Sequence, residues 1–147
     1  MDGSVIDFLS AVSGSRSLQI YVKCFVSAVD DEVYPISLFI KTERAEGEIR
    51  ISGIGHGLIS APVKVQVVHM NGYGEVSFIN EWNGINFADL SNKNVEECGF
   101  SGDGGVISAI YIKIEEIYIS ILAIDDEMRI DAGGENKNVR ESEWTVI

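Results

Sequence analysis

The sequence is poor in the residues that cross-link a chain, kink it or bind metal ions. Its 147 residues include only two prolines, two cysteines and two histidines. Cys24 and Cys98 lie far apart and neither belongs to a CxxC pair, so the pattern predicts neither a disulfide framework nor a zinc site. A domain of this length needs no such cross-link, because it can bury roughly 68–70% of its unfolded surface. We expect two reduced thiols, no metal and no other cofactor.

Positive charge is also scarce, since 11 Lys and Arg stand against 23 Asp and Glu and give a net charge of −12. Proteins that bind nucleic acids or anionic membranes hold the phosphates with clustered cations. The densest basic stretch here, Lys137 to Arg140, is flanked by Glu135 and Glu141. Direct binding to nucleic acid or to an anionic membrane is therefore not expected.

A long uncharged hydrophobic run is absent as well. The most apolar stretch, Val106 to Ile124, contains Lys113, Glu115 and Glu116 at its centre, which argues against a membrane span. The first 13 residues carry two aspartates where a secretory signal requires cations. We therefore expect a cytoplasmic protein that is not bound to a membrane.

Sequence motifs of catalysis are incomplete. The glycine-rich stretch 53–57 (GIGHG) lacks both the GxGxxG spacing and the Gly-Lys-Ser/Thr ending of nucleotide-binding loops, and 99–104 (GFSGDG) lacks a glycine of the nucleophile elbow. Glycines around His56 are typical of a loop at a strand end. His69 lies on the same face of a predicted strand as three valines. We therefore expect it to be a partly buried histidine that forms a hydrogen bond. We predict a protein that is not an enzyme, and catalysis by His56 or His69 is the lesser alternative.

Helical spacing of apolar residues marks the N-terminus. Ser4 is placed to cap a short helix, and Gly14 is placed to end it. The apolar stripe of this helix consists of Val5, Phe8, Leu9 and Val12. A helix this short needs a surface to pack on.

The pattern then changes to alternation, which indicates strands. Pro35 would stand at the start of the second strand, where a missing N–H is tolerated. The predicted strands are Leu18–Ala28, Ile36–Lys41, Glu48–Ser52, Met128–Ile130 and Val139–Val146, with a hairpin over 63–79 and a long loop over 83–105 that has room for one helical turn or strand.

The isoleucine-rich stretch Val106–Ile124 changes phase in its middle. Isoleucines occupy even positions before Glu115-Glu116 and odd positions after it. A slip of one residue reverses the face of every later side chain, so the chain must turn or bulge there. Because Glu-Glu is poor chemistry for a two-residue turn, we predict one long bulged strand.

These elements define the expected fold class. About seven to eight strands with one short N-terminal helix predict an α+β, mainly β fold, built as an antiparallel sheet or sandwich. Neither a linker nor a repeat interrupts the chain, so we expect a single domain over residues 1–147.

The acidic residues gather at predicted strand ends and in loops, where they are candidates for contacting a partner. They are Asp30, Asp31, Glu32, Glu43, Glu46, Glu48, Glu96, Glu97, Asp103, Asp125, Asp126 and Glu127. Several aromatic residues beside loops fit interface anchors and core packing equally well. These are Tyr73, Trp82, Phe87, Phe100 and Trp144.

An acidic surface attracts a basic protein through electrostatic steering. We therefore expect a protein-binding module, of the inhibitor or immunity type, that neutralises a basic partner such as a nuclease toxin. The alternative is a structural protein of a secretion system or phage that forms homo-oligomers through strand edges, with Val106–Ile124 as the edge. Acidity that serves only solubility, and binding of a small ligand, are further readings.

Overall fold

In the computed structural model, residues 3–51, 57–61, 74–103, 105–124, 127–134 and 144–147 are described. They form one α-helix, one short 3-10 helix and antiparallel strands, which confirms the mainly β fold class. The strands are more numerous than expected, because several are only two residues long. The elements are α1 (Gly3–Val12), β1 (Gln19–Ser27), β2 (Val33–Lys41), β3 (Glu46–Ile51), β4 (Leu58–Ala61), β5 (Gly74–Ile79), β6 (Glu81–Trp82), β7 (Ile85–Asn86), η1 (Phe87–Leu90), β8 (Glu97–Asp103), β9 (Val106–Ile114), β10 (Ile117–Ile124), β11 (Glu127–Gly133) and β12 (Thr145–Val146).

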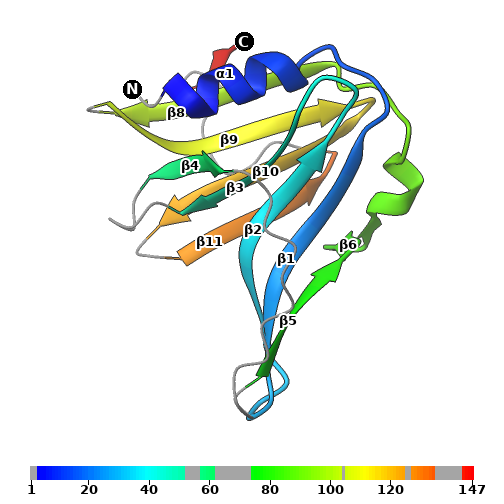
Figure 1. The fold of residues 1–147 in the computed structure, drawn as a ribbon, viewed down its shortest axis with the longest axis vertical. Coiled ribbons are helices and arrows are strands. Elements are labelled where there is room, and N and C mark those ends of the chain that lie inside the picture. Colours follow the sequence, from blue (N-terminus) through cyan, green and yellow to red (C-terminus); the bar gives the residue numbers. More distant parts are fainter. Residues whose placement is uncertain (1–2, 52–56, 62–73, 104, 125–126, 135–143) are drawn as a thin grey trace.

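Two five-stranded sheets make up the molecule (Figure 1). The first has the order β4-β3-β2-β1-β5 and the second the order β11-β10-β9-β8-β12, while β6 and β7 form a small ribbon. Strand β4 contacts β9, and β11 contacts β2 and β3, so each sheet covers a face of the other. One hydrophobic core contains side chains from both sheets.

Helix α1 closes one end of this core. Val5, Leu9 and Val12 are fully buried, as their helical spacing predicts. The helix contacts β4 of the first sheet and β8 of the second, and Figure 1 shows it lying across the sheets. It begins at Gly3, one residue before the predicted cap, and Gly14 follows its end with a φ of 72°.

Strand β1 alternates as its sequence predicts, with Ile20, Val22 and Cys24 facing the core. Its partner β2 starts earlier than expected, at Val33, so Pro35 lies inside the strand and not at its start. The register shifts there, because Lys23 pairs with Ser37 and Cys24 pairs with Pro35. Within the described residues, strand β3 pairs with β2 only from Ser37 onward, so this end of β2 has no partner there on the β3 side, and proline is tolerated at such an edge.

The prediction of one bulged strand over Val106–Ile124 is wrong. Ile114 pairs with Ile117, so Glu115-Glu116 is a two-residue turn between β9 and β10. Across this turn Ile112 pairs with Ile119, which places an even and an odd position on the same face and explains the change of phase. Glu115 adopts a φ of 55°, and its Oε1 lies 2.7 Å from Lys93 Nζ. The pairing of β9 with β10 therefore reverses the chain at Glu115-Glu116, although glutamate is unfavourable in a two-residue turn.

The predicted long loop over 83–105 holds more regular structure than the single helical turn or strand expected there. It contains β7, η1 and the seven-residue strand β8, which pairs with β9 inside the second sheet. Glycine and serine in β8 weaken the alternation of apolar and polar residues that would identify a strand. Packing explains why one of these residues, Gly99, is a glycine. A Cβ built on Gly99 would overlap the ring of Tyr111, its cross-strand partner. An aromatic ring over a strand glycine replaces the packing that the glycine lacks.

The remaining strand predictions fall partly outside the described residues. Of the predicted hairpin over 63–79, residues 74–79 are described, and they form β5, which pairs with β1. The predicted strand Met128–Ile130 lies within the longer β11. Of the predicted final strand, residues 139–143 lie outside the described part, and β12 pairs with β8.

Replacing Gly99 tests the contact with Tyr111. We expect Gly99→Ala to lower the free energy of unfolding by about 1–3 kcal/mol, because the added methyl group overpacks a well-filled site. Gly133→Ala is the matched control, since a Cβ on this strand glycine would meet nothing within 4 Å. It should change stability by less than about 0.5 kcal/mol in urea unfolding. Equal effects of the two substitutions would contradict the packing account.

Candidate functional site

The hairpin that joins β1 to β2 forms one end of the molecule, away from α1 (Figure 1). We call residues 27–36 the hairpin tip. Its turn is closed by backbone hydrogen bonds, in which the Ser27 N–H donates to the Glu32 carbonyl at 2.9 Å and the Asp31 N–H donates to the Ser27 carbonyl at 3.0 Å. Asp31 lies in the left-handed region with a φ of 57°, which Asp tolerates better than most residues.

Apolar side chains are unusually exposed on the hairpin tip. Val29 is 83% exposed, Tyr34 45%, Val33 43% and Ile36 37%. These are four of the seven large hydrophobic side chains that are exposed in the described part of the chain. Exposed apolar side chains that gather in one place indicate a surface for a partner, whereas scattered ones do not.

Three of the predicted partner-binding acids lie among these apolar residues. Asp30, Asp31 and Glu32 are all exposed. The Glu32 N–H donates to Asp30 Oδ1 at 3.0 Å, and the Tyr34 hydroxyl donates to Glu32 Oε2 at 2.8 Å. The hydroxyl also lies 3.3 Å from Asp30 Oδ2. Hydrogen bonds therefore link the side chains of Asp30, Glu32 and Tyr34 without a partner, and such preorganisation reduces the entropy lost on binding.

Hydrogen bonds at the tip also shift two pKa values. The pKa of Asp30 is lowered, first because its carboxylate accepts the Glu32 N–H and to a lesser extent because it accepts from Ser27 and Tyr34. The hydrogen bond to the Glu32 carboxylate raises the pKa of Tyr34 to about 12. At neutral pH the tip therefore presents a charged Asp30 beside a protonated phenol.

Three other predicted acids lie outside the tip and are already paired. Glu43 lies 3.6 Å from the Arg16 guanidinium, and Glu96 lies 3.7 Å from Lys113 Nζ. Glu97 accepts a hydrogen bond from the Tyr111 hydroxyl at 2.6 Å. The two ion pairs partly compensate the charges of Glu43 and Glu96, whereas the uncharged Tyr111 hydroxyl only donates a hydrogen bond to Glu97.

Glu48 is not at the surface, contrary to the prediction that it contacts a partner. Its side chain is 2% exposed and lies 3.4 Å from both Lys23 Nζ and Ser37 Oγ. A buried carboxylate needs such partners to offset its desolvation. Glu48 therefore serves the packing of the first sheet.

The last five acids divide between the described and undescribed residues. Glu46 and Glu127 are exposed at the starts of β3 and β11. Asp103 ends β8, and its side chain is not described. Asp125 and Asp126 lie outside the described residues.

The aromatic residues proposed as anchors pack inside the molecule where they are described. Phe87 and Phe100 are buried, and the Trp82 indole N–H donates to the Ile130 carbonyl at 2.7 Å. Trp144 packs edge-on against Tyr111 with ring centroids 4.8 Å apart. Tyr73 lies outside the described residues. The exposed aromatic of interest is instead Tyr34, which follows the Asp-Asp-Glu triplet in the sequence.

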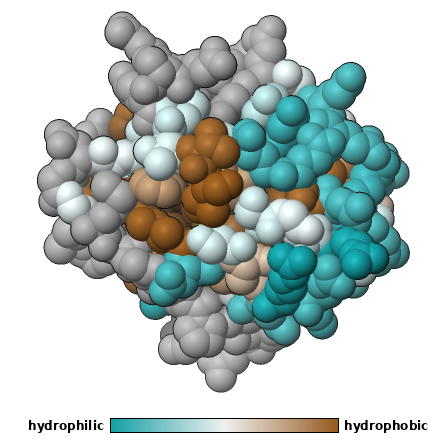
Figure 2. Space-filling view, turned by 90° about the horizontal axis from the view of Figure 1, so that it is seen from above, coloured by the Kyte–Doolittle hydropathy of each residue, from teal (hydrophilic) through white to brown (hydrophobic). Residues whose placement is uncertain are grey.

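The opposite end of the molecule differs from the hairpin tip. Figure 2 views the molecule from the side of α1 and shows hydrophobic residues beside a largely hydrophilic half. Val146 in β12 is 56% exposed. Apolar and polar residues are separate on this face, whereas they are interleaved at the hairpin tip.

Chemistry of other kinds has few candidates in the structure. Burial raises the pKa of the Cys24 thiol and raises that of Cys98 to about 12, so both are protonated core residues at neutral pH. His56 and His69 lie outside the described residues. Within the described ranges, acids, cysteines and histidines do not form a group able to hold a metal ion, and no helix is long and apolar enough to cross a membrane.

Neither a protein-family model, nor a curated protein, nor a solved structure matches this chain.

A carboxyl NMR titration tests the hydrogen bonds of the tip. Because the pKa of Asp30 is lowered in the folded state, its contribution to stability is present above the ordinary Asp pKa of about 4 and is lost as the pH falls through the lower folded value. Tyr34→Phe should raise the pKa of Asp30 only part of the way to normal, because the Glu32 N–H still donates. Tyr21→Phe, in an exposed tyrosine outside the tip, should leave it unchanged. An ordinary pKa for Asp30 in the unmodified chain would contradict this geometry.

Proposed function

We propose that this chain is an acidic protein-binding module that binds a basic protein through its hairpin tip. The observation that supports this proposal is the interleaving of Asp30, Asp31 and Glu32 with the exposed apolar residues Val29 and Tyr34. Apolar anchors within a charged surface are characteristic of protein interfaces. The function is recognition, without a chemical step.

The charge of the chain indicates which partner would bind. A net charge of −12 repels other acidic proteins and attracts a basic one, and this attraction raises the association rate. Apolar contacts at the tip would then slow dissociation, which is where most differences in affinity arise. Experiments at different salt concentrations distinguish the two contributions, because salt weakens the electrostatic attraction and leaves the apolar contacts largely unchanged.

The finer proposal is an inhibitor or immunity-type protein that neutralises a nuclease toxin in the cytoplasm. A nuclease holds the phosphates of its substrate with cations. A projecting hairpin with three carboxylates at its tip fits such a cationic cleft and would compete with nucleic acid for it.

Assembly through strand edges is the second candidate, in a changed form. The stretch Val106–Ile124 cannot serve as the edge, because β9 and β10 both lie inside the second sheet. Strand β11 is the edge strand next to β10, and it exposes Glu127 and Arg129. Charged side chains on an edge strand oppose pairing between copies. The observations therefore favour the hairpin tip.

Removing the three tip charges tests the proposal. Asp30→Asn, Asp31→Asn and Glu32→Gln together should weaken binding of the partner by roughly tenfold or more, because complementary charges are lost. Asn also tolerates the left-handed conformation at position 31, so the turn should persist. The partner is first captured from lysate on the immobilised chain and identified, and its affinity is then measured over a range of salt concentrations.

A second triple variant, Glu46→Gln, Glu116→Gln and Glu127→Gln, removes the same amount of charge from exposed acids elsewhere. It should retain the partner. A captured protein that is neutral or acidic, or one that both triple variants bind equally, would contradict the proposal. Inhibition of the nuclease activity of the partner would support the finer version.

A substitution of Val29 distinguishes an effect on binding from an effect on the stability of the fold. Because its side chain is 83% exposed, Val29→Ser should change the free energy of unfolding by less than about 0.5 kcal/mol. It should nevertheless shorten the lifetime of the complex, measured by surface plasmon resonance. Val146→Ser, at an exposed valine of β12, should leave that lifetime unchanged. If Val29→Ser left the lifetime of the complex unchanged, the proposal that Val29 makes an apolar contact with the partner would be contradicted.

A further inference from the structure

Strand β1 has a gap in its pairing on the side away from β2. Its backbone groups alternate between the two sides, and two hydrogen bonds fix which residues point where. The Ser27 N–H donates to the Glu32 carbonyl, so the odd-numbered residues of β1 face β2. Leu18 donates to the Lys93 carbonyl and accepts from the Asn92 N–H, so the even-numbered residues face the other side.

Ile20 is the even-numbered residue left without a strand partner on that side. Leu18 is paired with the chain after η1, and Val22 is paired with Ile79 at the end of β5. Between these two pairs the chain bends away at Asn80 and enters β6. Among the described residues, no strand pairs with Ile20 there, so its N–H and C=O face the gap between these two pairs without a ladder partner.

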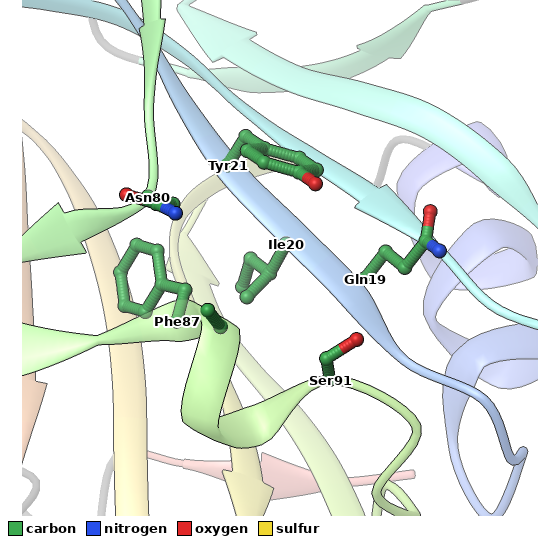
Figure 3. A pocket seen from close by; sticks show the side chains of 7 residues that line it. Gln19, Ile20, Tyr21, Asn80, Phe87 and Ser91 are labelled. Atoms are coloured by element: carbon green, nitrogen blue, oxygen red, sulfur yellow. The ribbon is translucent and has the colours of Figure 1, made fainter.

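A pocket of about 180 Å³ lies at this place. Figure 3 shows Ile20 of β1 on one side and Phe87 and Ser91 on the other, with Gln19 and Asn80 at its two ends. Ligand pockets for whole metabolites measure about 300–1,000 Å³, so this one is too small for a nucleotide or a drug-sized molecule. It has room for a group the size of one amide.

We propose that this pocket, the β1 notch, binds one amide group. The N–H and C=O of Ile20 are a donor and an acceptor side by side, which is the complement of an amide in an antiparallel ladder. Phe87 provides an apolar floor, and Gln19 and Asn80 supply further polar groups at the rim. The amide is either a peptide group of an extended segment or the carboxamide of an Asn or Gln side chain.

The β1 notch is a site separate from the hairpin tip. Gln19 and Ser27 stand at opposite ends of β1, eight residues apart, or about 26 Å along an extended strand. Loss of binding at one site therefore says nothing about the other. The proposal does not depend on the identity of the basic partner.

Amide hydrogen exchange tests the gap itself. The Ile20 amide should exchange at least about tenfold faster than the amides of Leu18 and Val22, because only these two donate to a neighbouring segment. Equal protection of the three amides would overturn the proposal, since Ile20 would then already have a partner.

An NMR titration tests the ligand. N-Methylacetamide represents a peptide group and acetamide represents a carboxamide, and either should shift the Ile20 amide resonance in a saturable way at millimolar concentration. A response to N-methylacetamide alone identifies the peptide group, and a response to acetamide alone identifies the side-chain carboxamide. The absence of a saturable shift with both would overturn the proposal.

A larger side chain that fills the β1 notch tests where the amide binds, and the same substitution at the next residue is the matched control. Ala88 is exposed and lines the pocket, so Ala88→Leu should abolish the shift, whereas Asp89→Leu, one residue on in η1, should preserve it. Ser91→Leu gives a second way to fill the same space if Ala88→Leu disturbs η1. A shift that survives in the filled variants, or that is lost equally in Asp89→Leu, would place the amide elsewhere.

Discussion

The apolar layer between the two sheets is the constraint on which the other features depend. Leu38 of the first sheet and Ile112 and Ile119 of the second are almost completely buried in the same core. Burying one such side chain stabilises the fold by about 1.5–3 kcal/mol, so the alternation of each strand is fixed by the need to face this layer. Helix α1 has no stability of its own at ten residues, and it forms because it closes one end of the layer.

The hairpin tip acquires its character where this layer ends. Between Ser37 and the turn, β2 has no pairing with the described residues of β3, and a shift in register accompanies Pro35. Val33, Tyr34 and Ile36 therefore remain exposed although their residue types suit a core. The same strands are thus structural at one end and available for recognition at the other, with carboxylates in the turn between them. The β1 notch arises from a related cause, because β5 ends opposite Val22 and does not reach the start of β1 at Gln19.

Sequence reasoning succeeded where one periodic signal dominated. The helix with Leu9 and Val12, and strand β1 with Val22 and Cys24, follow directly from spacing. It failed where local turn chemistry opposed tertiary pairing. Glu115 adopts a conformation that glycine or asparagine would favour, yet the pairing of β9 with β10 outweighs that cost. The position and length of strand β8 were missed because Gly99 leaves space for a ring that belongs to a different strand.

The sequence by itself determined the acidic character, the mainly β class, and the position of an acidic turn between two strands. These properties depend on composition and on periodicity within a single segment. Only the tertiary structure decided which acids share a surface, because the distance between segments depends on how the strands pair. Glu48 and Asp31 are both acids beside predicted strands, but one is buried by Lys23 and Ser37 and the other stands free in the turn. That difference is created by neighbours from other strands, which the local sequence does not specify.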